Sequence, residues 1–242
     1  MADLTDRQTQ ILKAIIEEYI ETAQEAGSET LEKKYNLGIS PATIRNEMVK
    51  LTKAGFLKQI HASAGRTPTP LGLKYYVHEL MEPRKLSTTE EVAVKGKIWD
   101  YRMEVGKLLR EATRELARRS KALALTTLDT GDLYAAGMAN ILEMPEFYDI
   151  DLTKAVLSLL DRFDFWQGLV EKAIEAEDPI HILLGNDLGI ELLSPCGFIY
   201  THYQIPPHHG AIGVVGPVRL NYSEVIPLVS YFGGLIEEIG RK

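Results

Sequence analysis

Residues 40–53 read SPATIRNEMVKLTK, and this stretch decides the fold of the first part of the chain. Ser40 followed by Pro41 predicts a helix start, because a serine side chain satisfies a free backbone amide there and proline suits the first helical position. Apolar residues then recur at steps of four and three, which predicts one buried face of a helix that runs to Lys53. These residues are Ile44, Met48 and Leu51. The opposite face is polar and basic, so we expect it to be exposed.

The sequence on either side of this helix predicts two earlier helices and a later hairpin. Thr5 and Gln8 have the spacing of a capping box for a first helix, from about residue 6 to 25, with a wide apolar stripe. A short helix over 28–35 and a tight turn at Asn-Leu-Gly 36–38 follow. After the central helix we expect a strand over 56–61, a turn-rich wing over 62–70 and a last helix. We therefore predict a winged helix-turn-helix DNA-binding domain over residues 1–86.

The net charge of −7 is unevenly distributed along the chain. The segment from Ser40 to Tyr76 contains six Lys and Arg residues and only one acidic residue, Glu47. Nucleic-acid binding depends on the local field, because salt screens charges that are more than about 10 Å away. The overall acidity is therefore compatible with DNA binding by this part of the chain.

Candidate DNA contacts come from the exposed helix face and from the hairpin. A helix of this kind enters the major groove with its first turns at the base edges. We expect Asn46 to pair with adenine, Arg45 to contact guanine or phosphate, and Arg66 at the wing tip to reach the minor groove or a phosphate. The other candidates contact phosphates, neutralise the charge of the DNA backbone or let the protein backbone approach the DNA closely. The predicted set is Ser40, Ala42, Thr43, Arg45, Asn46, Lys50, Lys53, Ser63, Gly65, Arg66 and Thr67.

Residues 88–119 predict one long helix, which we assign to a linker over 87–121. Its apolar residues alternate at steps of four and three, as in a heptad seam. They are Val94, Ile98, Tyr101, Val105, Leu108 and Ala112. Two interpretations stay open, because the seam fits a coiled coil between two chains and also a helix that lies on its own second domain.

Beyond residue 121 short strand-like runs alternate with helices, which predicts an α+β domain over 122–242. The expected strands are 122–128, 180–184, 198–205 and 211–215, and the expected helices lie near 152–161, 165–176 and 223–239. The whole chain is therefore predicted to be an α+β protein.

Composition excludes several classes of protein. A single cysteine, Cys196, rules out an internal disulfide framework and a metal cage of paired thiolates. No apolar run approaches the length of a membrane span, and the first residues lack the features of a signal peptide, so we expect a cytoplasmic protein.

Features that resemble catalytic or cofactor motifs have simpler interpretations. Cys196 with the histidines at 202, 208 and 209 could suggest a nucleophile and base or a metal site, but Cys196 is best explained as a small buried side chain, and the adjacent histidines beside Pro206-Pro207 as part of an exposed loop. The glycines at 210, 213 and 216 lack the dinucleotide-binding spacing, and Asp129-Thr130-Gly131 has no partner carboxylate with which to share a proton. We predict that the chain is not an enzyme and holds no metal or cofactor.

Five sequence motifs in a fixed order point to a known family. They are SPATIRNEM at 40–48, SAGRTPT at 63–69, GLKYYV at 72–77, NILEMPEF at 140–147 and GVVGPVR at 213–219. In this combination the chain resembles the HrcA family of heat-inducible transcription repressors. The resemblance implies a homodimer that binds an inverted-repeat operator upstream of chaperone genes, with a GAF-like second domain and assistance from the GroEL chaperonin. Family members carry a long dimerising insertion where only about residues 122–133 stand here, so the second domain is shortened.

Two other functions stay open at this point. In one, the winged helix belongs to a regulator whose C-terminal domain senses a small molecule, in an apolar pocket under Tyr134, Phe198, Tyr200 and Tyr203. In the other, the winged helix binds a protein instead of DNA.

Overall fold

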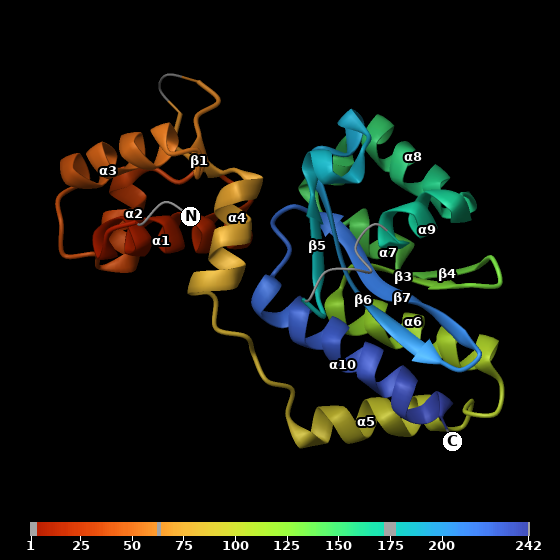
Figure 1. The fold of residues 1–242 in the computed structure, drawn as a ribbon. Helices are drawn as coiled ribbons and strands as arrows, with labels where there is room; N and C mark the ends of the chain where they lie inside the picture. The colour runs from red at the N-terminus through yellow and green to blue at the C-terminus, as the bar shows by residue number, and fades with distance from the viewer. Residues whose placement is uncertain (1–3, 62–63, 172–177, 242) are drawn as a thin grey trace. The chain divides into compact units, whose positions relative to one another are not determined.

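A computed structural model describes residues 4–61, 64–171 and 178–241 of the chain (Figure 1). The chain divides into two compact units, Met1–Glu82 and Pro83–Lys242. Each unit has its own buried core. The mixture of helices and antiparallel strands confirms the predicted α+β class.

Unit 1 is mostly helical. Its elements are α1 (Asp6–Thr22), α2 (Ser28–Tyr35), α3 (Pro41–Lys53), β1 (Leu57–Lys58), β2 (Thr67–Pro68), α4 (Pro70–Tyr75) and a π-helical turn, η1 (Tyr76–Leu80). The Thr5–Gln8 capping box forms as predicted, but α1 ends at Thr22 because Ala23 adopts a left-handed conformation. The predicted strand over 56–61 is only two residues long, and it pairs antiparallel with β2.

The core of unit 1 forms where α1 and α3 pack together. Ile11, Leu12, Ile15 and Ile16 of α1 are fully buried, as are the α3 residues Ile44 and Leu51. Complete burial of aliphatic side chains of this size contributes roughly 1.5–3 kcal/mol each. This packing fixes the rotation of α3 about its own axis. The side chains on the opposite face of the helix therefore point outward from unit 1.

Unit 2 is built around a five-stranded antiparallel sheet with the strand order β4-β3-β7-β6-β5. Its strands are β3 (Leu123–Leu128), β4 (Asp132–Ala136), β5 (His181–Leu184), β6 (Cys196–Ile205) and β7 (His208–Pro217). Its α-helices are α5 (Thr88–Trp99), α6 (Val105–Ser120), α7 (Met138–Ile141), α8 (Ile150–Ser158), α9 (Phe163–Glu171) and α10 (Tyr222–Gly240). Short 3₁₀ turns lie at Pro145–Tyr148, Leu159–Asp161, Gly185–Leu188 and Glu191–Leu193.

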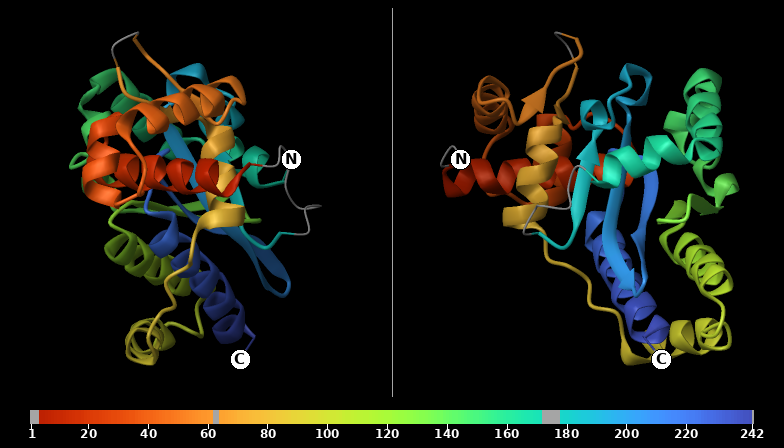
Figure 2. Two further views of the ribbon diagram at one scale, coloured as in Figure 1. Left: turned by 90° about the vertical axis from the view of Figure 1, so that its left-hand side faces the viewer. Right: turned by 45° about the vertical axis from the view of Figure 1, so that its right-hand side comes forward.

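Helices cover both faces of this sheet (Figure 2). Thr126 and Thr201 lie on the same face, since both are paired with Ile212. On this face the Thr126 hydroxyl is 2.7 Å from the hydroxyl of Thr113 in α6. Helix α10 packs on the same face at Gly233, where a Cβ would overlap the methyl group of Thr201. The other face carries the apolar side chains of the segment from α7 to α9. Unit 2 is thus a sheet between two helical layers.

The single helix predicted over 88–119 is wrong, because the structure has two helices, α5 and α6, with a turn between Trp99 and Val105. Val94 and Ile98 of α5 and Leu108 and Ala112 of α6 are fully buried within unit 2. Lys97 also donates a hydrogen bond of 2.8 Å to Glu115, which joins the two helices side by side. Four of the six seam residues are therefore covered by the chain's own domain, whereas Tyr101 is exposed and Val105 is half-buried at the turn between the helices. A straight helix could not bring both halves of the seam onto that domain.

Candidate nucleic-acid interface

The outer face of α3 presents polar and basic side chains. Ser40, Ala42, Arg45, Asn46, Lys50 and Lys53 are exposed, and Thr43 is half-buried. The hydroxyl of Ser40 accepts a hydrogen bond of 3.3 Å from the backbone amide of Thr43 and lies 3.0 Å from its hydroxyl. The helix start is therefore fixed by its own cap, and the residues beyond it project from a rigid element.

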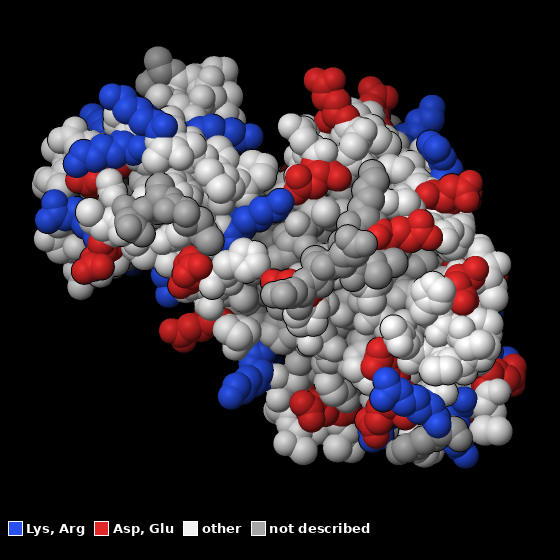
Figure 3. All heavy atoms as spheres, in the orientation of Figure 1, with Lys and Arg blue, Asp and Glu red and all other residues white. Residues whose placement is uncertain are grey.

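The cations of this face are only partly neutralised. Lys50 forms an ion pair of 2.9 Å with Glu47, whereas Arg45 and Lys53 form none within the described ranges 4–61, 64–171 and 178–241. Glu47 is buried at the edge of the face and also accepts a hydrogen bond of 3.2 Å from Gln8 in α1. The hydrogen bond from Lys50 lowers the pKa of Glu47, so this carboxyl stays ionised. Figure 3 shows the basic side chains that gather over α3.

Arg66 lies at the base of the hairpin, which corrects the predicted position at its tip. Its Nε donates to the hydroxyl of Thr52 in α3 at 3.1 Å, and its Nη1 donates to the carbonyls of Ala64 and Gly65 at 3.3 and 3.2 Å. Its backbone forms a two-way antiparallel bridge with Ala26, with both N–O distances at 3.0 Å. The side chain therefore ties the hairpin to α3.

The other predicted hairpin residues have different environments. A Cβ on Gly65 would lie 2.6 Å from the carbonyl oxygen of Ala26, so the close approach of two backbones requires glycine here. Thr67 is buried, and its hydroxyl has no hydrogen-bond partner among the residues that the structure describes. Its side chain is therefore not available for a phosphate in this conformation. Ser63 lies outside the described residues.

A groove of about 400 Å³ runs between α3, the hairpin and the start of α2. Arg45 and Val49 line it from α3, Gln59 and Arg66 line it from the hairpin, and Ser28 lines it from α2. The α2 side of this groove and the contact between Arg66 and Thr52 could not be predicted from the sequence. Both depend on chain segments that are distant in sequence, and no local pattern signals them.

The family model and the curated relatives agree on one family. The family model described as the HrcA protein C terminal domain matches residues 74–226, which is more than half of the chain. The chain belongs to the HrcA family. The resemblance that the five motifs carry is thus confirmed.

Curated HrcA proteins match nearly the whole chain. The heat-inducible transcription repressor HrcA of Clostridium tetani is 29% identical and covers 99% of this chain and 95% of its own length. That of Desulforamulus reducens is 28% identical, over 93% of this chain and 94% of its own. This second alignment spans 327 positions whereas the chain has 242 residues, so at least 85 positions have no counterpart here. This HrcA chain is shorter than those relatives by internal segments.

One solved structure shares the fold of the whole chain. The crystal structure of a hypothetical protein superposes with a TM-score of 0.78 over 99% of both chains, at 18% sequence identity. At this identity the similarity concerns the fold alone.

The residues that resemble a nucleophile and base lie in two paired strands: Cys196 and His202 in β6, and His208 and His209 at the start of β7, where a loop was expected. Cys196 is 1% exposed, and burial raises the pKa of its thiol to about 12. His208 and His209 lie 3.0 and 3.3 Å from the carboxylate of Asp129. Among the described residues no group of three His, Cys, Asp or Glu side chains is placed to hold a metal ion, and no helix is long and apolar enough to cross a membrane.

Three of the four aromatic residues proposed as the lining of a ligand pocket lie in the interior of unit 2, whereas Tyr134 is half-buried with the Arg110 guanidinium 5.8 Å from its ring centre. Phe198, Tyr200 and Tyr203 are almost completely buried. Tyr203 donates a hydrogen bond of 2.6 Å to the carbonyl of Thr127, and Tyr200 donates one of 3.3 Å to Leu169. Phe198 and Tyr200 stack with their ring centres 4.7 Å apart, while Tyr203 lies on the opposite face of the sheet. Buried rings with satisfied hydroxyls form a core, which counts against a pocket beneath them.

Proposed function

We propose that the chain represses transcription by binding operator DNA through unit 1, which acts as a winged helix-turn-helix, and that it carries no catalytic activity. The observation that supports this most directly is α3, whose apolar face is buried against α1 while its polar and basic face is exposed. A helix that is fixed on one side and basic on the other suits the major groove of B-DNA.

The proposed roles follow the positions of the side chains on α3. Arg45 and Asn46 are exposed near the helix start and read base edges, while Lys50 and Lys53 neutralise phosphates further along. Ser40 and Thr43 lie at the cap and contact a phosphate. The groove beside α3 leaves room for the sugar-phosphate backbone of the second DNA strand to approach Arg45. Arg66 acts by holding the hairpin in place.

The proposed partners are a second copy of the chain and, as the family resemblance implies, the GroEL chaperonin. Two copies would present two reading heads, and a symmetric pair of heads recognises an inverted repeat. For unit 2 we propose a GAF-like domain, which the strand order β4-β3-β7-β6-β5 and the helices on both faces support.

A salt titration tests this function. Binding of the full chain to a duplex with an inverted repeat is compared with binding to a scrambled duplex at each salt concentration. The molecular mass of the protein in solution is measured under the same conditions. We expect a dimer that prefers the repeat and whose affinity falls steeply as salt rises, because phosphate contacts release counterions. Equal weak binding to both duplexes, or salt-insensitive association, would contradict the proposal.

A further inference from the structure

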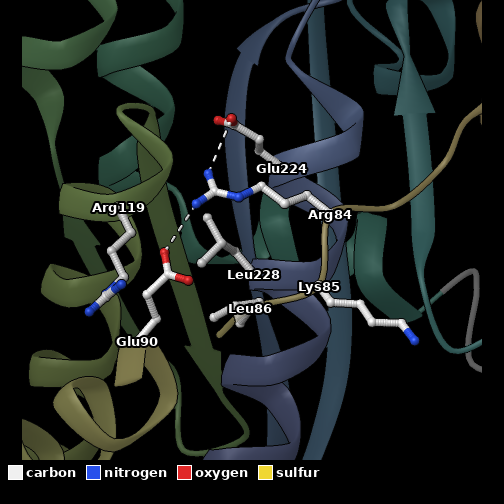
Figure 4. Close-up of a pocket in the computed structure, with 7 residues that line it drawn as sticks. All are labelled: Arg84, Lys85, Leu86, Glu90, Arg119, Glu224 and Leu228. Atoms are coloured by element: carbon white, nitrogen blue, oxygen red, sulfur yellow. Dashed lines mark hydrogen bonds and ion pairs between the residues drawn. The ribbon is translucent and has the colours of Figure 1, made fainter. Parts of the chain in front are cut away.

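Helix α5 packs on the body of unit 2 with one face, and its opposite face is open (Figure 1). Val94 and Ile98 on the packed face are fully buried. Figure 4 shows that Glu90, in the first turn of α5, points toward Arg84, which also pairs with Glu224 in α10. These contacts fix the rotation of α5 about its own axis, so the same side chains always point outward.

The open face of α5 carries a regular stripe of uncharged residues. Thr89, Val92, Gly96 and Trp99 recur at steps of three and four, which is the spacing of the a and d positions of a coiled coil. We call these four residues the outer seam. Val92 is 65% exposed, and a hollow of about 300 Å³ lies between it, Gly96 and Trp99. The outer seam thus has the pattern of a helix that packs against another helix, with room for a side chain of the partner.

Gly96, at the centre of the outer seam, is not required by packing within the described part of the chain. A glycine inside a helix costs stability relative to alanine, and the φ angle of Gly96 does not lie in the left-handed range. A Cβ at this position would meet no described atom within 4 Å, in contrast to Gly233, whose Cβ would overlap Thr201. The missing side chain therefore favours a close approach from outside the chain.

The charges beside the outer seam fit a second copy of the chain in parallel orientation. Lys95 lies on one side of the seam and Asp100, five residues later, on the other, which are the g and e positions that face each other between parallel helices. Asp100 is exposed and forms no ion pair within residues 4–61, 64–171 and 178–241. Lys95 lies 2.6 Å from Glu238, but its ammonium has further N–H donors. In an antiparallel pair Lys95 would instead face Arg102, and the like charges would repel each other.

We propose that two copies of the chain associate through the outer seam, as a parallel pair of α5 helices with two-fold symmetry. Each seam residue then lies against its own counterpart, and the indole of each Trp99, which leans toward the helix start, covers the hollow at Gly96 of the second copy. The two helix starts lie at the same end of the pair, so both chains lead to their unit 1 from that end, as an inverted repeat requires. This inference rests on the proposed homodimer and assigns its surface.

The size of this contact sets its strength. Helix α5 has 12 residues, which makes it about 18 Å long. A helix pair of this length buries less than the roughly 800 Å² per partner of a stable interface. We therefore expect weak association in free solution, which strengthens when both copies bind one duplex.

Analytical ultracentrifugation of the full chain without DNA tests the surface. We expect a monomer–dimer equilibrium in the micromolar range, weakened about tenfold or more in Gly96→Gln, because the new side chain fills the hollow. The urea midpoint of the Gly96→Gln monomer should not fall, since the chain leaves open space there. Gly168→Gln is the matched control, because Gly168 in α9 is also a helical glycine with open surroundings, and its association should be unchanged.

Disulfide cross-linking of Val92→Cys tests the parallel orientation. Two-fold symmetry places both introduced thiols side by side, so mild oxidation with diamide should give a covalent dimer. The natural thiol does not interfere, because Cys196 is 1% exposed. Arg114→Cys, on the exposed side of α6, is the control and should stay monomeric. Failure of Val92→Cys to cross-link would exclude the parallel pair.

DNA binding by the same proteins separates this inference from the proposed function. If the unaltered chain stays monomeric up to about 100 μM, or if Gly96→Gln associates as tightly, the outer seam is not the interface. If the chain nevertheless prefers the inverted repeat, the proposed function stands and only the surface is wrong. If the chain dimerises through the outer seam but does not prefer the repeat, the surface is confirmed and the proposed function fails.

Discussion

Helices α3 and α6 are both rich in lysine and arginine, yet their cations have different surroundings. On α6, Lys107, Arg114 and Arg118 each pair with a glutamate three residues earlier, and Arg110 lies 5.8 Å from the ring centre of Tyr134. On α3 only Lys50 has such a partner within the described part of the chain. The number of basic residues on a helix therefore does not indicate a DNA-binding surface.

The difference lies in where the acidic residues stand. Glutamates three or four residues from a cation share its side of the helix, so the positive field of α6 is cancelled at short range. The acidic residue of α3 is buried at the edge of the exposed face and neutralises one cation there. What makes α3 the candidate interface is the absence of carboxylates paired with Arg45 and Lys53 among the described residues.

The largest effect is expected for Arg45→Ala, with Arg114→Ala on α6 as its matched control. Loss of a base or phosphate contact by Arg45 should lower operator affinity about five- to 150-fold, since one good contact is worth about 1–3 kcal/mol. Arg114→Ala should leave affinity unchanged. Fluorescence anisotropy with an inverted-repeat duplex measures both. Equal losses in the two folded variants would mean that α3 and α6 do not differ in the way proposed.

Arg66→Ala separates a structural role in the hairpin from direct contact with DNA. Arg66 makes three hydrogen bonds to Thr52, Ala64 and Gly65, so its loss should destabilise unit 1 by about 1–2 kcal/mol. Lys58→Ala is the control, because Lys58 is exposed on β1. Urea unfolding gives the stability, and DNA binding is measured under conditions in which both variants are folded. Unchanged stability with reduced affinity would support the wing-tip role that the sequence predicted.

The parts of the fold that could be predicted are those that local rules decide. The Ser40 cap, the buried face of α3 and the capping box at Thr5 all follow from residues within one or two helical turns. The strands β6 and β7 were also predicted, although the structure extends both. The exposed side of α3 could be predicted because burial of the other side leaves no alternative.

The parts that could not be predicted depend on distant contacts. Tyr101 and Val105 continue the heptad spacing, and only the packing of α5 and α6 on the same body breaks the helix between them. Strand β4, at residues 132–136, pairs along its whole length with β3, but its short polar start gave no strand signal. Arg66 was misplaced because its position depends on a bridge to Ala26, which is forty residues away.

A smaller effect is expected for Glu47→Gln, which removes the one carboxylate on α3. Lys50 loses its ion-pair partner and becomes available to a phosphate, whereas the amide oxygen introduced at position 47 can still accept the hydrogen bond from Gln8. Affinity for the operator should rise about twofold at low salt, since partly exposed ion pairs are worth about 0.2–1 kcal/mol. The gain should shrink as salt rises. A loss of affinity would instead show that Glu47 holds Lys50 in its binding position.

The smallest effect concerns the pH dependence of unit 1. Because the hydrogen bond from Lys50 lowers the pKa of Glu47, the ionised carboxyl is favoured in the folded state. Its contribution to stability is complete above the ordinary pKa of glutamate and is lost as pH falls through the lowered value. For a pair whose lysine is 61% exposed, we expect a few tenths of a kcal/mol. The free energy of unfolding, measured between pH 6 and about pH 3, should therefore depend slightly less steeply on pH for Glu47→Gln than for the unaltered chain. Identical pH profiles would mean that the Lys50 contact does not persist in solution, and all three exposed cations of α3 would then be available to DNA.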